Sequence, residues 1–238
     1  MKAFLLAAGY GTRLKPLTDS IPKCLVPINN QPLLSWWIKL LKKHHISEVL
    51  INTHYHSEQV SNYAKGISQT DIKIKIVYEK ELLGSGGTIK NNANFVCDET
   101  EFLICYADNL TCVDLSKLIH LHNSHSDILT MGLFHANNPT QCGIAMINTE
   151  NIITEFIEKP LKPRSNLANA GIYVASNRIF DYFPPNKAVF DLGHDILPLL
   201  TNKMRGHIIH EYLLDIGTIE NYKKANEDWK NDYISNPT

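Results

Sequence analysis

The sequence predicts an α/β protein with a Rossmann-like central sheet, mixed but mostly parallel, helices on both of its faces, and a small strand-rich subregion. Apolar runs of strand length alternate with amphipathic runs of helical period along the first half of the chain. A glycine-rich turn directly follows the first apolar run. Of the 238 residues 44% are hydrophobic and 20% charged, which is typical of a globular protein with a sizeable core. Ligands of such sheets bind beyond the carboxyl ends of the strands.

The first half of the chain alternates strand and helix. Apolar residues at 33, 34, 37, 38, 40 and 41 give one segment a helical period, whereas short apolar runs bounded by turn residues predict buried strands. The expected strands are 2–8, 48–52, 72–78, 101–106 and 128–134, and the expected helices are 32–44, 57–64, 88–95 and 115–122.

The second half is richer in strands. Its expected strands are 142–148, 152–158, 168–175 and 206–210, and its expected helices are 176–182, 193–200 and 218–230. The Pro- and Lys-rich stretch at 159–164 reads as an exposed loop and not as a domain linker, so we expect one domain over residues 1–238.

Composition excludes several classes of partner. The formal net charge is −1, so we expect no general attraction to nucleic acid or to a membrane surface. Five scattered cysteines without a Cys-x-x-Cys pair indicate reduced thiols and not a disulfide framework. No signal pattern opens the chain and no apolar run has membrane-spanning length, so we expect a cytoplasmic protein.

The glycine-rich turn predicts a polyphosphate site. Gly9 and Gly11 allow backbone N–H groups to approach a phosphate, and Arg13 and Lys23 supply fixed positive charge. A dinucleotide fingerprint would need a third glycine where Leu14 stands, and no Gly-Lys-Ser/Thr ending is present. A tight turn with incidental charges is the alternative.

Residues 9–23 form the motif Gly-x-Gly-Thr-Arg-x-x-Pro-Leu-Thr-x-x-x-Pro-Lys. This motif resembles the signature of the sugar-1-phosphate nucleotidyltransferases, also called nucleotide-sugar pyrophosphorylases. The resemblance is closest to the compact mannose-1-phosphate and D-glycero-D-manno-heptose-1-phosphate guanylyltransferases. It implies transfer of a nucleotidyl group from an NTP to a sugar-1-phosphate, with release of pyrophosphate. It also implies a nucleotide-binding half (about 1–112) and a sugar-binding half (about 113–238). Further matching motifs follow in the family's order: Leu-Gly-Ser-Gly-Gly at 83–87, Ala-Asp at 107–108, Glu-Lys-Pro at 158–160, Asn-Ala-Gly at 169–171 and Leu-Asp-Ile-Gly at 214–217.

The resemblance assigns roles to individual residues. Arg13 is expected to hold the β- and γ-phosphates and the leaving group, and Lys23 the α-phosphate region and the sugar phosphate; these two are the expected catalytic residues. The expected nucleotide-binding residues are Leu6, Ala7, Ala8, Gly9, Gly11, Thr12, Arg13, Glu79, Gly84 and Asp108. The expected sugar-phosphate-binding residues are Lys23, Gly143, Glu158, Lys159, Asn169 and Gly171.

Asp108 and Asp215 are the expected Mg²⁺ ligands. Asp108 follows an apolar strand, and Mg²⁺ prefers a few carboxylates together with substrate phosphates. A turn or helix-capping role is the alternative for Asp108, and capping of the last helix is the alternative for Asp215.

Glu79 is the residue from which we predict which nucleotide base the site prefers. It lies five residues before Gly84, where the uridylyl and thymidylyl transferases of the family commonly have glutamine. An ionised carboxylate only accepts hydrogen bonds, which suits the two adjacent donors of guanine and disfavours the carbonyl oxygens of uracil or thymine. GTP is therefore the favoured NTP, unless Glu79 is only a solvent-exposed loop residue.

Two other functions stay open. One is a uridylyl-, thymidylyl- or cytidylyltransferase acting on another sugar or phosphate ester, and the other is a non-catalytic nucleotide-sensing subunit of the same fold. The sequence does not decide the sugar, or whether the chain forms a homo-oligomer.

Overall fold

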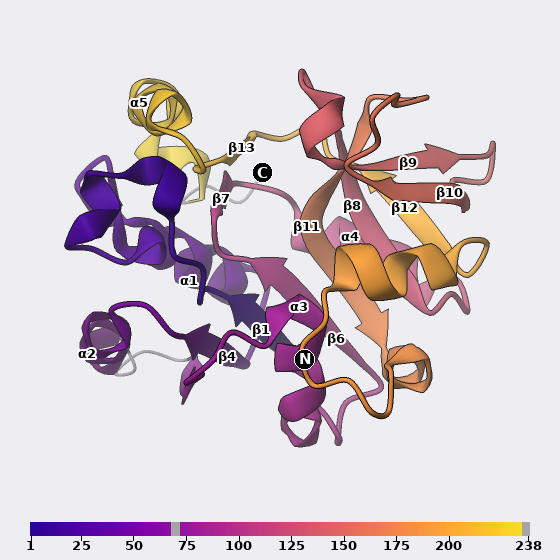
Figure 1. Ribbon diagram of the computed structural model, residues 1–238, viewed down its shortest axis with the longest axis horizontal. Coiled ribbons are helices and arrows are strands. Elements are labelled where there is room, and N and C mark those ends of the chain that lie inside the picture. Colours follow the sequence, from indigo (N-terminus) through magenta and orange to yellow (C-terminus); the bar gives the residue numbers. More distant parts are fainter. Residues whose placement is uncertain (68–71, 235–238) are drawn as a thin grey trace. The chain divides into compact units, whose positions relative to one another are not determined.

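The chain passes alternately through two compact units, which are described separately below. The structure, a computed structural model, describes residues 1–67 and 72–234, without the side chain of Asp232 (Figure 1). Unit 1 comprises Met1–Leu82, Tyr106–Asp114 and Glu211–Thr238, and unit 2 comprises Leu83–Cys105 and Leu115–His210.

Unit 1 contains a parallel sheet whose strands are joined by helices. The strand order is β1-β4-β5. Lys2 of β1 pairs with Glu48 of β4, and Thr53 of β4 pairs with Tyr78 of β5. Its other strands form two short antiparallel ladders, β2 with β3 and β7 with β13. The elements are β1 (Lys2–Leu6), β2 (Pro27–Ile28), β3 (Gln31–Pro32), α1 (Leu33–Lys43), β4 (Glu48–Thr53), α2 (Ser57–Ile67), β5 (Lys73–Tyr78), β7 (Asn109–Thr111), β13 (Leu213–Asp215) and α5 (Ile219–Asp228).

Helix α1 forms because its apolar residues repeat with helical spacing, and it buries that face in the core of unit 1. Trp36 and Trp37 are each 2% exposed, as expected for core residues. Their indole N–H groups still need acceptors when buried: Trp36 donates to the Ile28 carbonyl at 3.2 Å and Trp37 to the Asn109 carbonyl at 2.7 Å. Helix α1 thereby fixes the start of β7.

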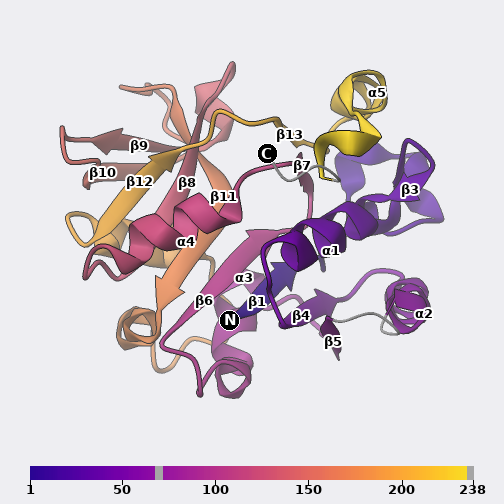
Figure 2. The same cartoon turned by 180° about the vertical axis from the view of Figure 1, so that it is seen from behind.

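Unit 2 contains the strand-rich part of the chain. Its strands pair mainly antiparallel around β11, which is bonded to β6, β8 and β9, while β12 lies parallel to β8. Helix α4 packs against β8, β11 and β12 (Figure 2). The elements are α3 (Gly84–Asn91), β6 (Glu101–Tyr106, whose last residue belongs to unit 1), α4 (Leu115–Asn123), β8 (Leu129–His135), β9 (Gly143–Ile147), β10 (Ile153–Glu158), β11 (Leu167–Ser176) and β12 (Met204–Ile208).

The predicted fold class is confirmed as mixed α/β, with a sheet flanked by helices and the expected parallel strands in unit 1. Three predicted helices differ in kind or position. The helix expected at 88–95 begins earlier, at Gly84, and ends in a separate 3₁₀ turn. Residues 177–182 form a 3₁₀ helix, and 192–200 form a π turn followed by a 3₁₀ turn. Within the described ranges, no helix is long and apolar enough to span a bilayer.

Candidate functional site

The glycine-rich turn of unit 1 begins where β1 ends. Ala7 donates its backbone N–H to Asn52 Oδ1 at 2.8 Å, and this bond ties the turn to the end of β4. Farther along, Thr18 Oγ1 donates to the Gly11 carbonyl at 2.8 Å, and a 3₁₀ turn covers Thr12–Leu14. Residues 7–11 therefore connect β1 to this 3₁₀ turn; Gly9 and Thr12 are exposed and Ala8 is buried.

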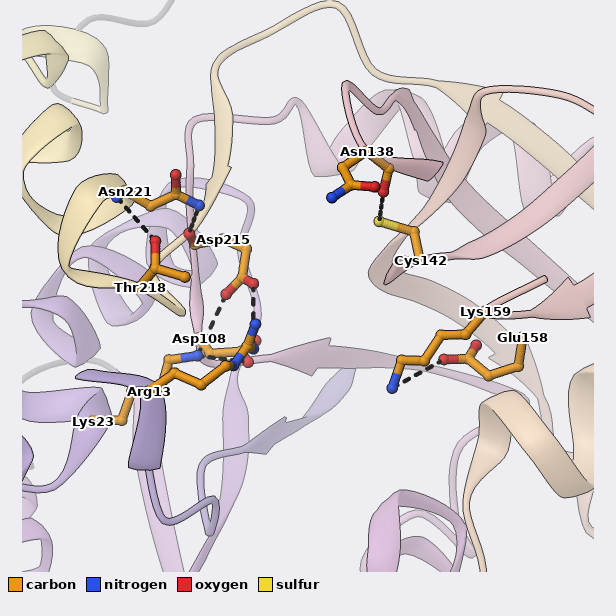
Figure 3. Close-up of polar contacts among 10 residues, drawn as sticks. All are labelled: Arg13, Lys23, Asp108, Asn138, Cys142, Glu158, Lys159, Asp215, Thr218 and Asn221. Atoms are coloured by element: carbon orange, nitrogen blue, oxygen red, sulfur yellow. Dashed lines mark hydrogen bonds and ion pairs between the residues drawn. The ribbon is translucent and has the colours of Figure 1, made fainter. Parts of the chain in front are cut away.

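Lys23 lies between two carboxylates of unit 1. Its ammonium donates to Asp108 Oδ2 at 2.9 Å and to Asp215 Oδ1 at 3.4 Å, and its side chain is only 11% exposed (Figure 3). Arg13 Nη2 lies 3.8 Å from Asp215 Oδ2, with a side chain that is 62% exposed. Residues from four separate parts of the sequence thus form one charged cluster, hereafter the Lys23 cluster: Arg13, Lys23, Asp108 and Asp215.

A short ladder brings the two aspartates of this cluster together. Strand β7 follows Asp108, and β13 ends at Asp215, which pairs with Asn109. The backbone N–H of Ile216 donates to the Asp108 carbonyl at 2.8 Å, which closes the ladder beside both carboxylates. The sequence analysis missed β7 and β13, because three-residue strands give too short an apolar pattern to detect.

Helix α5 supports Asp215 from its C-terminal side. Thr218 caps the helix by accepting the N–H of Asn221 at 3.1 Å, and the Asn221 amide donates to the Asp215 carbonyl at 2.8 Å (Figure 3). The capping alternative for Asp215 is therefore wrong, because Thr218 fills that position.

Within the Lys23 cluster, the surroundings of Asp215 oppose its ionisation. Burial raises the pKa of Asp215, the charge of Asp108 raises it further, and Lys23 and Arg13 act in the opposite direction. A carboxylate such as that of Asp215, whose ionisation is opposed by burial and by a neighbouring carboxylate, is chemically suited to an added cation. Two carboxylates also match Mg²⁺, which takes its other ligands from phosphates and water. Among the described residues no group of three or more His, Cys, Asp or Glu is placed to hold a metal.

Glu79 follows β5 and is 4% exposed, so the solvent-exposed alternative is wrong. Its Oε1 accepts the side-chain amide of Asn52 at 2.9 Å. Its backbone N–H donates to the Thr53 carbonyl at 2.8 Å, and its carbonyl accepts Nδ1 of His54 at 2.7 Å. Residues 52–54, at the end of β4, therefore fix Glu79 through both its side chain and its backbone.

Asn52 links Glu79 to the glycine-rich turn. Because the Ala7 N–H can only donate, it must face the Asn52 oxygen, and the Asn52 NH₂ group must then face Glu79. The sequence analysis missed Asn52 and His54; their signal was their place at the carboxyl end of a predicted strand.

Unit 2 pairs two of the predicted sugar-phosphate residues across strands. Gly143 begins β9 and lies opposite Glu158, the last residue of β10. Lys159 follows with φ = 49°, and its backbone N–H donates to the Cys142 carbonyl at 3.0 Å. A non-glycine residue in this left-handed region is uncommon and often marks a functional position. The Lys159 ammonium lies 3.8 Å from Glu158 Oε1 (Figure 3).

Asn169 and Gly171 lie at an irregularity of β11. The register with β8 shifts between Asn169 and Tyr173, and Gly171 has φ = 67°. The Asn169 side chain spans this irregularity, accepting the Gly171 N–H at 2.9 Å and donating to the Tyr173 hydroxyl at 2.6 Å. Such bulges are frequent beside functional sites, where they redirect side chains.

The predicted residues are thus divided between the units. Unit 1 holds the glycine-rich turn, Glu79 and the Lys23 cluster, whereas unit 2 holds Gly84 and five of the six residues expected to bind the sugar phosphate. Gly84 begins α3 and belongs to the Leu-Gly-Ser-Gly-Gly motif.

Comparison with known proteins identifies relatives of the chain. The family model described as Nucleotidyl transferase matches residues 2–232. The chain is 35% identical to the D-glycero-alpha-D-manno-heptose 1-phosphate guanylyltransferase of Campylobacter jejuni, over 93% of this chain and 97% of that protein. It is 31% identical to the enzyme of the same name from Aneurinibacillus thermoaerophilus, over 96% and 98% of the two chains.

A solved structure is also similar. HddC from Yersinia pseudotuberculosis, complexed with GMP-PN, superposes with a TM-score of 0.79 and 26% identity, covering 96% of this chain and 99% of that one. The resemblance seen in the sequence motifs is therefore confirmed at the level of the family.

Proposed function

Since the chain belongs to the nucleotidyl transferase family, we propose that it transfers a guanylyl group from GTP to a sugar-1-phosphate of the mannose or manno-heptose type. An oxygen of the sugar phosphate attacks the α-phosphorus of GTP. The bond between the α-phosphorus and the bridging oxygen breaks, pyrophosphate leaves, and a GDP-sugar forms. The heptose-1-phosphate guanylyltransferases that match nearly the full length of the chain support this choice.

The Lys23 cluster is the single observation that carries the proposal. The attacking phosphate oxygen is already ionised at neutral pH, so the reaction needs no general base. It needs two anions to be brought together and charge to be stabilised on the leaving pyrophosphate. Arg13 and Lys23 supply that charge: the exposed Arg13 can reach the leaving group, and the nearly buried Lys23 contacts the α-phosphate and the sugar phosphate.

Asp108 and Asp215 would hold Mg²⁺. When bound, Mg²⁺ would neutralise part of the triphosphate charge. The two aspartates also orient Lys23, because its ammonium bonds to both of them.

The glycine-rich turn and Glu79 bind the nucleotide in this proposal. Residues 6–12 line the nucleotide, and the backbone N–H groups that follow Ala7 are offered to the phosphates, because the Ala7 N–H already donates to Asn52. Asn52 donates to Glu79 Oε1, which suits an ionised carboxylate that accepts the N1–H and N2 donors of guanine. Glu158, Lys159, Asn169 and the backbone at Gly143 and Gly171 bind the sugar phosphate.

The compartment is part of the same proposal. We propose the cytoplasm, because five scattered cysteines without a Cys-x-x-Cys pair are typical of reduced thiols.

The test is pyrophosphate release by the purified chain with Mg²⁺. GTP, UTP, dTTP and CTP are each supplied with mannose-1-phosphate or D-glycero-D-manno-heptose-1-phosphate. We expect turnover with GTP and one of these sugars to exceed every other combination. Faster turnover with a pyrimidine nucleotide would replace the guanylyl assignment, and nucleotide binding without turnover on any sugar phosphate would favour the sensing subunit.

Replacing Glu79 by Gln tests the base assignment separately. The variant keeps the bond from Asn52 to Oε1 but presents an amide N–H₂ instead of a carboxylate oxygen. We expect kcat/KM for GTP to fall by about tenfold or more, and the preference over UTP to narrow. An unchanged ratio of GTP to UTP would remove Glu79 from base recognition.

A further inference from the structure

The segment Phe190–Gly193 of unit 2 lies outside the sequence motifs. It nevertheless binds the Leu-Gly-Ser-Gly-Gly motif at 83–87. The Phe190 carbonyl accepts the backbone N–H groups of Gly86 and Gly87, each at 3.0 Å, and the Phe190 N–H donates to the Leu83 carbonyl at 3.0 Å. Asp191 Oδ1 accepts both the N–H and the hydroxyl of Ser85, at 3.0 and 3.1 Å. The motif is therefore bound to this segment through nearly every one of its residues.

The same segment reaches Glu158 two residues later. Gly193 lies in the π turn Leu192–Ile196, where a Cβ atom would come within 2.8 Å of Glu158 Oε2. A Cβ on Gly143 would come within 2.5 Å of the same oxygen. Both approaches are closer than Cβ atoms tolerate, so a side chain at either position would force the Glu158 carboxylate to shift. The space that the two glycines leave for this carboxylate is hereafter called the notch.

The π turn places Gly193 beside the Glu158 carboxylate. π turns are rare and occur frequently at functional sites. Asp195 closes this one, donating its N–H to the Asp191 carbonyl at 2.9 Å and accepting the Asp191 N–H on Oδ2 at 2.9 Å. Lys187 Nζ contacts the other carboxylate oxygen of Asp195 at 2.5 Å. The turn is thus held by its own side chains, which gives Gly193 a fixed position.

We propose that Phe190–Gly193 is a shared positioning element, in which Asp191 sets the nucleotide-side motif at 83–87 and Gly193 sets the sugar-binding carboxylate of Glu158. The inference rests on the proposed function, because it takes Glu158 and Gly84 as substrate-binding residues. Neither Asp191 nor Gly193 needs to touch a substrate. Each acts through its neighbour, so a change at one residue disturbs the binding of one substrate.

The experiment compares Gly193→Ala with Gly206→Ala in the full-length chain. A Cβ on Gly206 would also overlap a neighbour, at 2.5 Å from Leu133, but the atoms nearest to it belong to the apolar side chains of Leu133 and Ile147. We expect Gly193→Ala to raise the KM for the sugar-1-phosphate about tenfold with little change in the KM for GTP. Gly206→Ala is expected to lower the melting temperature and leave both KM values unchanged. Equal losses in the two variants would reduce Gly193 to a packing residue and overturn the proposal.

Asp191→Ala provides the complementary arm. It removes the acceptor of Ser85, so we expect the KM for GTP to rise severalfold while the KM for the sugar-1-phosphate stays constant. If Asp191→Ala and Gly193→Ala shift the KM for the same substrate, then the assignment of Asp191 to the nucleotide side and of Gly193 to the sugar side is wrong.

Glu158→Asp in the Gly193→Ala background tests direct coupling. Shortening Glu158 withdraws its carboxylate from the notch, so the cost of Gly193→Ala should largely disappear in the double variant. Additive costs would contradict contact between the two residues. If the wild-type chain turns over no sugar-1-phosphate at all, the proposed function fails first; if wild-type turnover is normal and these shifts are absent, only the positioning element fails.

Discussion

The two units hold their candidate functional carboxylates by opposite means. In unit 1, Asp108 and Asp215 are held by charge, because the Lys23 ammonium bonds to both and Arg13 lies beside one of them. In unit 2, Glu158 is held by shape, because Gly143 and Gly193 leave room for its Oε2 and its ion-pair partner Lys159 is 3.8 Å away and 60% exposed. The Lys23 cluster should therefore be sensitive to charge, and the Glu158 notch to size.

Asp108→Asn is expected to have the largest effect. The change keeps the size of the side chain but removes the charge that orients Lys23 and would hold Mg²⁺. We expect kcat to fall by at least about 10³-fold with a normal circular dichroism spectrum. Asp228→Asn is the matched control, since it removes the same charge from an exposed pair with Lys224 on α5. Near-normal turnover in Asp108→Asn would remove Asp108 from the reaction.

Arg13→Ala should follow, with a loss of about 10² to 10³-fold in kcat, because the proposed function places this preorganised charge at the leaving group. The side chain is 62% exposed, so the melting temperature should change little. Lys15→Ala is the control, since it removes an exposed cation of the same loop that pairs only with Asp19 among the described ion pairs. A loss confined to KM would make Arg13 a ground-state binding residue and not a stabiliser of the leaving group.

Glu158 offers the sharpest contrast with the Lys23 cluster. If shape matters more than charge, Glu158→Asp should cost more than Glu158→Gln, because Gln keeps the length that fills the notch. We expect kcat/KM for the sugar-1-phosphate to fall about 10²-fold in Glu158→Asp and less in Glu158→Gln. The reverse order would mean that the notch, like the Lys23 cluster, works through charge.

The same contrast explains what the sequence could and could not predict. Arg13, Lys23, Asp108 and Asp215 were predictable because each stands in a motif of fixed residue types, and charge is visible in a sequence. That β7 and β13 would bring the two aspartates together was not, because a three-residue ladder depends on tertiary contacts such as the bond from Trp37 to Asn109.

Gly193 illustrates the other limit. In a sequence, a glycine that leaves space for another side chain looks the same as a glycine that only forms a turn. The two can be told apart only when the residue packed against the glycine is known, as Glu158 is for Gly193. The predicted start of helix α3 was wrong for a related reason: three of the first four residues of α3 are glycines, which disfavour a helix. Gly86 and Gly87 are nevertheless anchored by the carbonyl of Phe190, which lies 104 and 103 residues later in the chain. Tertiary bonds outweighed the local propensity there.

The smallest expected effect is a change in melting temperature, which should be positive for a variant of unit 1 and negative for a variant of unit 2. Because the pKa of Asp215 is raised in the folded chain, the folded state binds this proton more tightly than the unfolded state. The free energy of unfolding therefore falls as pH rises from 3.8 towards the raised pKa, and stays lowered above it. At neutral pH without added metal, Asp215→Asn should raise the melting temperature slightly while activity is lost, and the gain should shrink as the pH falls towards 3.8.

Asp195 of unit 2 is the control of opposite sign. Its hydrogen bond from Lys187 lowers its pKa, so it adds stability above pH 3.8 that is lost as pH falls through the lowered value. Asp195→Asn should therefore lower the melting temperature at pH 7. A melting temperature that also falls in Asp215→Asn would mean that Lys23 and Arg13 outweigh burial and the charge of Asp108. The Lys23 cluster would then be a stabilising ion-pair network in the absence of metal, and not a site that gives up stability in order to bind a cation and a triphosphate.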